Sequence, residues 1–431
     1  MFRILIYAPE LAGHPQIYCR VIADALRDED CHLDLALGIG EKGRIADVPD
    51  LHPLIDRRGV DLLPTRESSA TASNFLRAEE LAALQDRLRT DCTLFIEADK
   101  SEAEFRRIAA GEAPRLRGRN VGIFANTAEW YPGEDSFTGV PRRIRAKTLR
   151  TTLGNIKRAL LDQRKTARYF YEELILGRHV LDAVIVKDER LASWFGPPAL
   201  WMPEISRPAA TPEAAEDQRL YEALSSAYRE FLHRNQGREP VLYFGDAAFY
   251  KGYDLFLEYL RREPAVCGVH AGRTYDSVQR SYFQVDVEAV RRLLMQEGRL
   301  FETNCYIHSH RLKQLFFGSI ERYVTTHRLT LSSSTALQAL ELGKPLLVAG
   351  QGLLGHRVRT NALGRTYRYG DVDDLIVQGR EFRREDPARY APAIRSFIRH
   401  FSDAEIVRFF RGALLQSTPS RSLGTAHVPL R

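Results

Sequence analysis

The sequence predicts an α/β protein made of two doubly wound domains in tandem. Its 431 residues exceed the roughly 250–300 at which one hydrophobic core stops growing. Short apolar strand patterns alternate with amphipathic helix patterns, which is typical of parallel sheets covered by helices on both faces. The alternation breaks at 204–240, a stretch rich in Pro, Ala and charged residues, and then resumes.

The first half opens with a strand, a loop and a helix. The apolar segment FRILIYA leads into a Pro- and Gly-containing loop, and a helix face follows, marked at the i, i+3, i+4, i+7 spacing by Tyr18, Val21, Ile22 and Ala25. Further strands are expected at HLDLALGIG, CTLFIEAD, NVGIFAN and DAVIVKD, and helices at AEELAALQDRLR and RYFYEELILG.

The second half repeats this pattern after one polar helix within 204–240. Strands are expected at VLYFG, AVCGVH, NCYIHSH and PLLVAG, and helices at YDLFLEYLRR, VEAVRRLLMQEG, TALQALEL and AEIVRFFRGALLQ. The final STPSRSLGTAHVPLR has the character of a loose tail. We expect domains at 1–205 and 206–400, and a C-terminal helix and tail at 401–431 that can pack back on the first domain.

Composition argues against a membrane-spanning or disulfide-linked protein. No stretch reaches the ~18 uninterrupted apolar residues of a spanning helix. Glu10 interrupts the N-terminus too early for a signal peptide, so we expect a cytoplasmic location. The cysteines are scattered, odd in number and never spaced C-x-x-C, which favours core packing over disulfides or a zinc knuckle. They are Cys19, Cys31, Cys92, Cys267 and Cys305.

Positive charge is concentrated in one run. The net charge is +6, and ten Lys or Arg lie from Arg142 to Arg168 against the single acid Asp162. This run is either a solvated face or a peripheral contact with the anionic inner face of the plasma membrane, where each such side chain contributes ~1 kcal/mol. A membrane contact would suit a lipid-linked acceptor, and nucleic acid is the less favoured partner.

Two loops are candidate ligand sites because open parallel sheets bind ligands beyond the carboxyl ends of their strands. Four hydroxyls precede the helix TALQALEL, where free backbone N–H groups and the helix dipole favour a phosphate. They belong to Ser332, Ser333, Ser334 and Thr335. One serine alone would only cap the helix, at ~1 kcal/mol, but four exceed what a cap needs.

The second loop follows the strand VLYFG. Gly245 ends that strand, and Lys251 and Gly252 precede a helix. A lysine there can neutralise a diphosphate, and a glycine lets the backbone approach it closely. The alternative is a solvated surface lysine. Because both loops follow strands of the same domain, we favour ligand binding.

These stretches resemble the nucleotide-sugar glycosyltransferases of the two-domain GT-B fold, family 4 in particular. Four segments carry the resemblance: YAPELAGHPQIYCRVIADAL, YFGDAAFYKGYDLFLEYL, SSSTALQALELGKPLLVAG and GRTYRYGDVDDLIVQ. It implies two Rossmann-like domains facing a central cleft, with the acceptor on the first and the donor on the second. The last segment is similar to a late strand and helix start of that family.

The resemblance also implies site residues. Donor-binding candidates are Gly13, Asn126, Lys251, Arg273, Ser332, Ser333, Ser334, Thr335 and Gln338. Catalytic candidates are His14, Glu97, Asp99 and Glu129, and each acid is equally readable as a helix cap or an ion-pair member. In an inverting reaction Asp99 or Glu97 would be the general base, whereas in a retaining one the departing phosphate would take the proton.

Three positions depart from the family pattern. Asp246 stands where an Arg usually follows the glycine, and Thr330 and Gln338 stand where two glutamates are usual. Gln338 can still hydrogen-bond a ribose hydroxyl, and Arg273 could replace the missing cation. The Ser-rich helix start is also similar to capsule and lipopolysaccharide transferases, which keeps CMP-linked donors open.

Three further motifs carry less information. GIGEKG, at 38–43, fits G-x-G-x-x-G but follows the second strand instead of the first. His308 and His310 would share one side of a strand without nearby Cys, Asp or Glu in ligand spacing. The triplet from Asp371 to Asp373 fits a helix start better than a metal site. No metal is implied.

We therefore predict a hexosyl- or related glycosyltransferase that uses a nucleotide-sugar co-substrate and no cofactor. The reaction is expected to retain configuration without a metal and to serve bacterial surface polysaccharide or glycoconjugate synthesis. The acceptor would be a glycan, a lipid-linked group or another hydroxyl. Two alternatives remain: a non-catalytic homologue that binds a nucleotide sugar or a partner protein, and a sugar-nucleotide epimerase or hydrolase.

Overall fold

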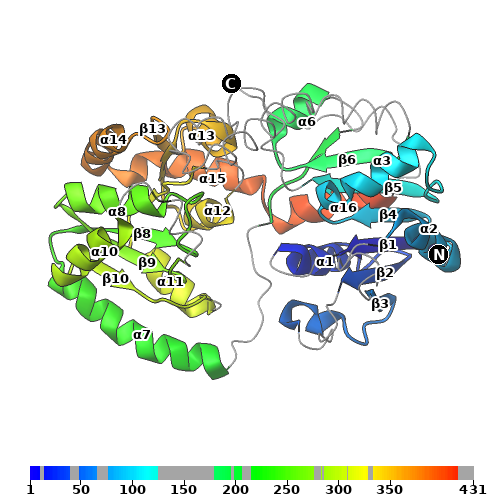
Figure 1. Cartoon of the computed structure of the whole chain (residues 1–431), viewed down its shortest axis with the longest axis horizontal. Helices are drawn as coiled ribbons and strands as arrows, with labels where there is room; N and C mark the ends of the chain where they lie inside the picture. Colours follow the sequence, from blue (N-terminus) through cyan, green and yellow to red (C-terminus); the bar gives the residue numbers. More distant parts are fainter. Residues whose placement is uncertain are drawn as a thin grey trace, which may run out of the picture. The chain divides into compact units, whose positions relative to one another are not determined.

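The computed structural model describes residues 1–9, 14–38, 48–65, 76–124, 179–195, 199–205, 215–275, 283, 286–307, 309–328 and 333–415. These residues divide into two compact units (Figure 1). Unit 1 contains the described residues up to 205 and those from 400 to 415, and unit 2 contains 215–399. Each unit has a parallel β structure packed with helices, as the alternation of patterns predicts.

Unit 1 is built on a seven-stranded parallel sheet with the order β3-β2-β1-β4-β5-β6-β7. Its strands are β1 (Phe2–Ala8), β2 (Cys31–Gly38), β3 (Val60–Thr65), β4 (Cys92–Phe95), β5 (Arg119–Phe124), β6 (Ala183–Val186) and β7 (Ala199–Trp201). The five predicted strands are confirmed. The two edge strands, β3 and β7, were not predicted because they are only partly buried and lack a continuous apolar run; β3 also contains Pro64.

Helices cover both faces of this sheet. The helical segments of unit 1 are α1 (His14–Ala25), η2 (Pro49–Leu54), α2 (Ala78–Leu88), η3 (Ala98–Ser101), α3 (Glu102–Ala110), α6 (Glu189–Phe195) and α16 (Asp403–Leu415). Ile4 and Ile6 of β1 pack in one core with α1 and α16, whereas Leu5 and Tyr7 pack in a second core with α2, α3 and α6. This alternation of successive side chains is what a strand buried on both faces requires.

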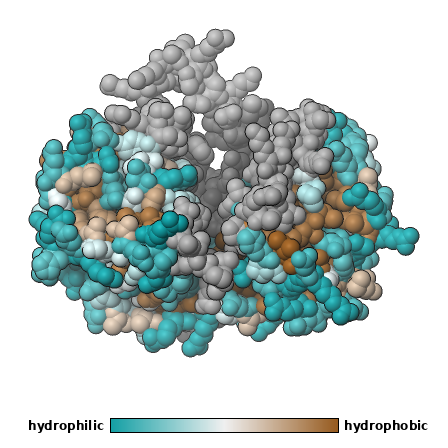
Figure 2. All heavy atoms as spheres, turned by 90° about the horizontal axis from the view of Figure 1, so that it is seen from below, coloured by the Kyte–Doolittle hydropathy of each residue, from teal (hydrophilic) through white to brown (hydrophobic). Residues whose placement is uncertain are grey.

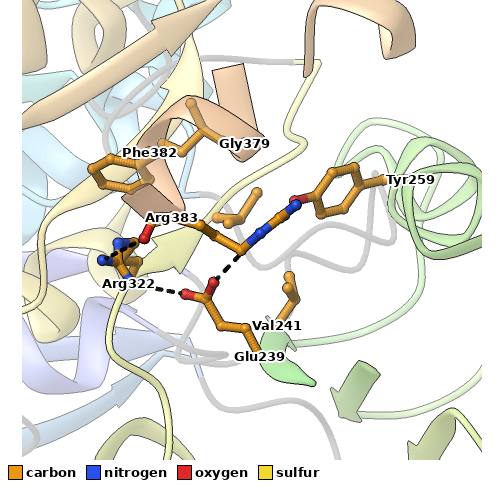
Figure 3. A pocket seen from close by; sticks show the side chains of 9 residues that line it. Glu239, Val241, Tyr259, Arg322, Gly379, Phe382 and Arg383 are labelled. Carbon is orange, nitrogen blue, oxygen red and sulfur yellow. Dashed lines mark hydrogen bonds and ion pairs between the residues drawn. The ribbon is translucent and has the colours of Figure 1, made fainter. Parts of the chain in front are cut away.

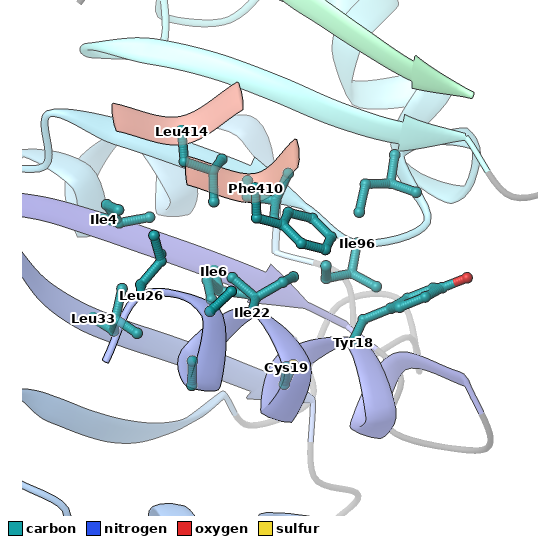
Figure 4. Close-up of a cluster of buried hydrophobic side chains, with 14 of the residues drawn as sticks. Ile4, Ile6, Tyr18, Cys19, Ile22, Leu26, Leu33, Ile96, Phe410 and Leu414 are labelled. Atoms are coloured by element: carbon teal, nitrogen blue, oxygen red, sulfur yellow. The ribbon is translucent and has the colours of Figure 1, made fainter. Parts of the chain in front are cut away.

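The helix α16 joins the first core although it lies near the end of the chain. Phe410 and Leu414 are fully buried against side chains of α1 and β1 (Figure 4). Arg119 Nη1 donates to the Ala413 carbonyl at 2.5 Å, and Arg411 Nε donates to the Ala25 carbonyl at 3.1 Å. The predicted helix AEIVRFFRGALLQ is therefore confirmed, and it belongs to the packing of unit 1.

Unit 2 contains two three-stranded parallel sheets, β10-β9-β8 and β11-β12-β13. The strands are β8 (Glu239–Phe244), β9 (Val266–Ala271), β10 (Leu300–Glu302), β11 (Tyr323–Val324), β12 (Leu346–Ala349) and β13 (Gly364–Tyr367). The edge strands β8 and β11 lie in contact, so the strands follow one another as β10-β9-β8-β11-β12-β13. This is the 3-2-1-4-5-6 order of Rossmann domains.

The helical segments of unit 2 include the four predicted helices and the helix start implied at GDVDDLIVQ, and the others were not predicted. They are α7 (Ala215–Arg234), α8 (Tyr253–Arg262), α10 (Val287–Gln296), α11 (His310–Gly318), α12 (Ser334–Glu341), α13 (Gly352–Thr360), α14 (Val372–Arg384), η7 (Pro387–Tyr390) and α15 (Ala391–Arg399). Asp371 caps α14 by accepting a hydrogen bond from the Asp374 backbone N–H at 2.9 Å. The interpretation of the Asp371 triplet as a helix start is therefore confirmed.

One predicted strand is wrong. The strand β10 ends at Glu302, before the segment NCYIHSH, and Ser309 already caps α11 by accepting from the Leu312 N–H at 3.2 Å. His310 is consequently the first residue of a helix and contacts Gln314. The apolar side chains of that segment are loop residues, which period-two spacing alone does not distinguish from a strand.

The structure also bears on the cysteines, on the hydropathy of the helices and on the surface. All five cysteines are free, and Cys19, Cys92 and Cys267 are buried. Among the described residues, no helix has the length and hydropathy to cross a membrane. Figure 2 shows hydrophilic side chains over much of the described surface of one face. The basic run Arg142–Arg168, the segment RYFYEELILG, most of GIGEKG and the C-terminal tail after 415 lie outside the described residues.

Candidate functional site

In unit 2 the chain builds the strands outward from β8 to β10 on one side and then from β11 to β13 on the other side, so the strand order changes direction between β8 and β11. In such sheets the loops leaving the two central strands diverge, and the crevice beyond their carboxyl ends is the usual place for a ligand. Two described loops meet there: residues 245–252 after β8 and residues 325–328 after β11. We call this the switch-point site.

Lys251 lies directly over the backbone of Gly245. Gly245 has φ +110°, and a Cβ placed there would lie 2.7 Å from Lys251 Nζ. Burial lowers the pKa of Lys251, Asp246 partly offsets this effect, and Arg273 lowers it further. No described carboxylate forms an ion pair with the Lys251 ammonium, so it can attract an anionic ligand.

The two loops are held together by backbone contacts. Thr326 Oγ1 donates to the carbonyls of Lys251 and Gly252, at 3.3 and 2.9 Å, and the Arg328 backbone N–H donates to the Tyr250 carbonyl at 2.8 Å. Gly252, with φ +68°, is required because a Cβ there would lie 1.9 Å from the Thr326 carbonyl oxygen. The position of Lys251 is therefore set by residues more than seventy positions away in the sequence.

A buried ion pair reinforces this junction. Both terminal nitrogens of Arg328 contact the Asp254 carboxylate, at 2.5 and 2.7 Å, and the Arg328 side chain is 10% exposed. Arg328 also donates to the Phe249 carbonyl at 2.9 Å. Its charge is thus neutralised within the protein, and its main effect is to fix the two loops.

The sequence analysis offered Arg273 as a replacement for a missing cation, and the structure gives it a carboxylate partner. Arg273 contacts Asp246 through Nε at 3.0 Å and Nη2 at 2.6 Å. The hydrogen bonds and charge of Arg273 lower the pKa of Asp246 although burial opposes this. Asp246 therefore offsets the charge that Arg273 would bring to a ligand.

The hydroxyl-rich start of α12 has partly structural roles. Ser333 caps the helix by accepting from the Ala336 N–H at 3.3 Å, and Thr335 Oγ1 contacts both Ser333 Oγ and Tyr323 OH, at 2.9 and 3.1 Å. Ser334 and Gln338 are half-buried on the same helix, and Ser332 lies outside the described residues. The cap expected as the simpler interpretation is present, and Ser334 and the helix dipole remain for a ligand.

A buried polar network supports the loop from below. His270 of β9 contacts the Gly245 carbonyl through Nε2 at 3.2 Å and Glu302 through Nδ1 at 3.3 Å. Tyr253 OH and Arg291 Nε also donate to Glu302, at 2.7 and 2.6 Å. Burial raises the pKa of Glu302, but these hydrogen bonds outweigh it and lower the pKa to about 2. The network therefore holds an ionised carboxylate and fixes Gly245.

In unit 1, Glu97 and Asp99 follow β4 at the carboxyl edge of the sheet. Glu97 adopts a left-handed backbone, with φ +56°, and Lys100 Nζ lies 2.6 Å from its carboxylate. A non-glycine residue in this conformation carries strain of about 1–3 kcal/mol and is common at functional sites. Gly13, Asn126, Glu129 and the side chain of His14 lie outside the described residues.

Next to Glu97 lies a buried lysine that the sequence analysis did not identify. Lys187 follows β6 and is 8% exposed, with Nζ 5.2 Å from the centre of the Tyr18 ring. Burial opposes its charge, but Tyr18, Glu204 and Glu97 outweigh that effect and raise its pKa. In the sequence, Lys187 is recognisable only as a charged residue immediately after the apolar run DAVIV. This pattern does not reveal which side chains surround Lys187.

Two other features lie away from the switch-point site. A cavity of about 10 Å³, room for one water, is lined by Glu239, Tyr259, Arg322 and Arg383 at the amino ends of β8 and β11 (Figure 3). Among the described residues, His32, Asp34 and Asp61 are close enough to hold a cation, but Arg3 already contacts Asp34 at 2.6 and 2.9 Å. Both features have internal partners that explain them.

Comparison with solved structures identifies the fold. No family model and no curated protein matches the sequence. The structure of HepE from Anabaena in complex with UDP matches with a TM-score of 0.58 and 13% identity, over 96% of this chain and 99% of that chain. Sucrose-phosphate synthase from Thermosynechococcus elongatus matches with a TM-score of 0.57 and 13% identity, over 96% of this chain and 98% of that chain.

A glycosyltransferase from Rickettsia africae matches with a TM-score of 0.58 and 12% identity, over 95% of this chain and 98% of that chain. These neighbours are GT-B glycosyltransferases with two Rossmann-like domains. Since the match spans nearly the full length of both chains, the predicted fold class is confirmed: this chain has the GT-B fold.

Proposed function

We propose that the chain is a glycosyltransferase that binds a nucleotide-sugar donor at the switch-point site. The observation that carries this proposal is the Lys251 ammonium, which is half-buried beside Gly245 and forms no ion pair with a described carboxylate. A diphosphate would provide the missing negative charge. The neighbour HepE was solved with UDP and with UDP and glucose, which makes a UDP-sugar the first donor to test.

The geometry favours catalysis by charge stabilisation. As the bond between the sugar and the phosphate breaks, negative charge grows on the leaving diphosphate, and a fixed ammonium stabilises that state in a partly desolvated site. The N-terminal end of α12 adds a favourable dipole. We propose a retaining, metal-independent transfer in which the leaving phosphate accepts the acceptor proton, with Glu97 and Asp99 of unit 1 acting on the acceptor.

We also propose a role in surface glycan synthesis, on the basis of two structural neighbours. Two neighbours are lipopolysaccharide transferases: WaaB, an outer core galactosyltransferase, and WaaG, a glycosyltransferase involved in lipopolysaccharide biosynthesis. A hexosyl donor and a surface glycan or lipid-linked acceptor would agree with the activities of these two neighbours. Peripheral contact with an anionic membrane through Arg142–Arg168 belongs to the same proposal.

Calorimetric titration with UDP tests the site. Lys251→Met should weaken UDP binding by about tenfold or more, because a hydrogen bond to a charged group contributes about 1.5–3 kcal/mol. Lys344→Met is the matched control, since Lys344 precedes β12 at the opposite end of the strands. Equal affinity of the two variants, or no UDP binding by the wild-type protein, would contradict the proposal.

Turnover separates the alternatives. The wild-type protein would be incubated with UDP-, GDP-, dTDP-, ADP- and CMP-sugars and a mixture of glycan acceptors, and nucleotide release would be followed. Acceptor-dependent release supports a transferase. Binding without release supports a non-catalytic homologue, and a changed sugar without transfer supports an epimerase.

A further inference from the structure

His327 lies at the junction that positions Lys251. Both of its sequence neighbours are bonded to the loop after β8: Thr326 contacts the carbonyls of Lys251 and Gly252, and Arg328 contacts Tyr250 and Phe249. The His327 backbone N–H donates to Thr325 Oγ1 at 3.3 Å. The His327 side chain is half-buried at the carboxyl end of β11, and it is close enough to Lys251 for the ammonium charge to act on the imidazole.

Among the described residues, the acidic groups near His327 are already paired with other side chains. Arg328 is neutralised by Asp254 of α8, and Arg273 by Asp246 of the loop after β8. Burial and the Lys251 ammonium lower the pKa of His327 to about 4, so the imidazole is neutral near pH 7. No ion pair or side-chain hydrogen bond joins it to any described residue, and a neutral imidazole retains one N–H to donate.

From this arrangement we infer that His327 is a second phosphate ligand of the switch-point site, donating its imidazole N–H to a donor phosphate oxygen beside Lys251. The inference rests on the proposed function, because it assumes that the anion is the diphosphate of a nucleotide sugar. An anion placed between Lys251 and His327 would satisfy both groups. It would also offset the ammonium charge that now disfavours protonation of the ring.

This arrangement has a consequence that a merely space-filling histidine would lack. A bound diphosphate stabilises the protonated imidazole, so the pKa of His327 must rise when UDP binds. A rise of one pKa unit means that UDP binds about tenfold more tightly to the protonated form than to the neutral form. His310 is a suitable comparison, because it lies in the first turn of α11, is exposed and contacts Gln314.

The test combines NMR with binding. The imidazole resonance of His327 in the wild-type protein is assigned from its loss in His327→Gln and followed from pH 5 to 8, with and without saturating UDP. We expect no titration without UDP, and a midpoint at least one pH unit above about 4 with UDP. UDP should leave the His310 resonance unchanged at each pH.

Binding supplies the second measurement. His327→Gln should weaken UDP binding about tenfold while leaving uridine, which has no phosphate, unaffected, and His310→Gln should change neither. If UDP binds the wild-type protein but the His327 resonance does not respond and His327→Gln binds normally, the inference is wrong and the proposed function stands. If UDP does not bind the wild-type protein, both are wrong.

Discussion

Gly252→Ala should disrupt the junction between the two loops of the switch-point site. The new Cβ would lie 1.9 Å from the Thr326 carbonyl oxygen, and Gly252 has φ +68°. The left-handed conformation costs a non-glycine residue about 1–2 kcal/mol, and relieving overpacking typically costs about 1–3 kcal/mol more. The total loss of local stability is therefore about 2–5 kcal/mol. Because Lys251 is the preceding residue, UDP binding should weaken as well.

Gly298→Ala separates the two contributions. Gly298 has φ +66°, nearly the same as Gly252, but no atom of the described residues lies within 4 Å of a Cβ placed there. Only the conformational cost of about 1–2 kcal/mol therefore applies. All three tryptophans, Trp130, Trp194 and Trp201, precede unit 2 in the sequence, so fluorescence would not report on it. Hydrogen exchange of peptides from β8 and α12 is the appropriate assay. Equal protection in the two variants would refute the contact between Gly252 and Thr326.

Three further outcomes are expected. Phe410→Ala should destabilise unit 1 by about 3–5 kcal/mol, measured by urea unfolding followed by tryptophan fluorescence. Arg408→Ala is the control, because the Arg408 side chain is 73% exposed and its loss should cost under about 0.5 kcal/mol. Similar losses of stability in the two variants would contradict the packing of α16. The pKa of Glu302 is about 2 in the folded protein against about 4.3 in the unfolded chain. Glu302 should therefore contribute about 3 kcal/mol to the free energy of unfolding above pH 5, and this contribution is lost as the pH falls toward 2. The free energy of unfolding of Glu302→Gln should depend less on pH in this range. Burial raises the pKa of Cys19 and Cys92 to about 12, so neither should react with an aromatic disulfide reagent in native protein at pH 8, as mass spectrometry of the labelled peptides would show.

The sequence by itself predicted features that depend on local burial. The strand β1 was recognisable because its side chains are buried on both faces, and α16 because its apolar residues repeat at helical spacing. The capping aspartate Asp371 was recognisable by its place before a helix. Edge strand β3 and the two-residue β11 escaped because partial burial and short length leave little periodic signal.

Only the tertiary structure decided what meets at the candidate sites. The contact between the Lys251 loop and Thr326 depends on β8 and β11 being neighbours, although β9 and β10 lie between them in the sequence. The pairing of Arg273 with Asp246 likewise joins the loops after two strands, and Lys187 after β6 is buried beside Tyr18 of α1. Periodicity records which face of an element is buried, whereas the partners of a charged side chain depend on strand order, which is set by the packing of distant crossovers.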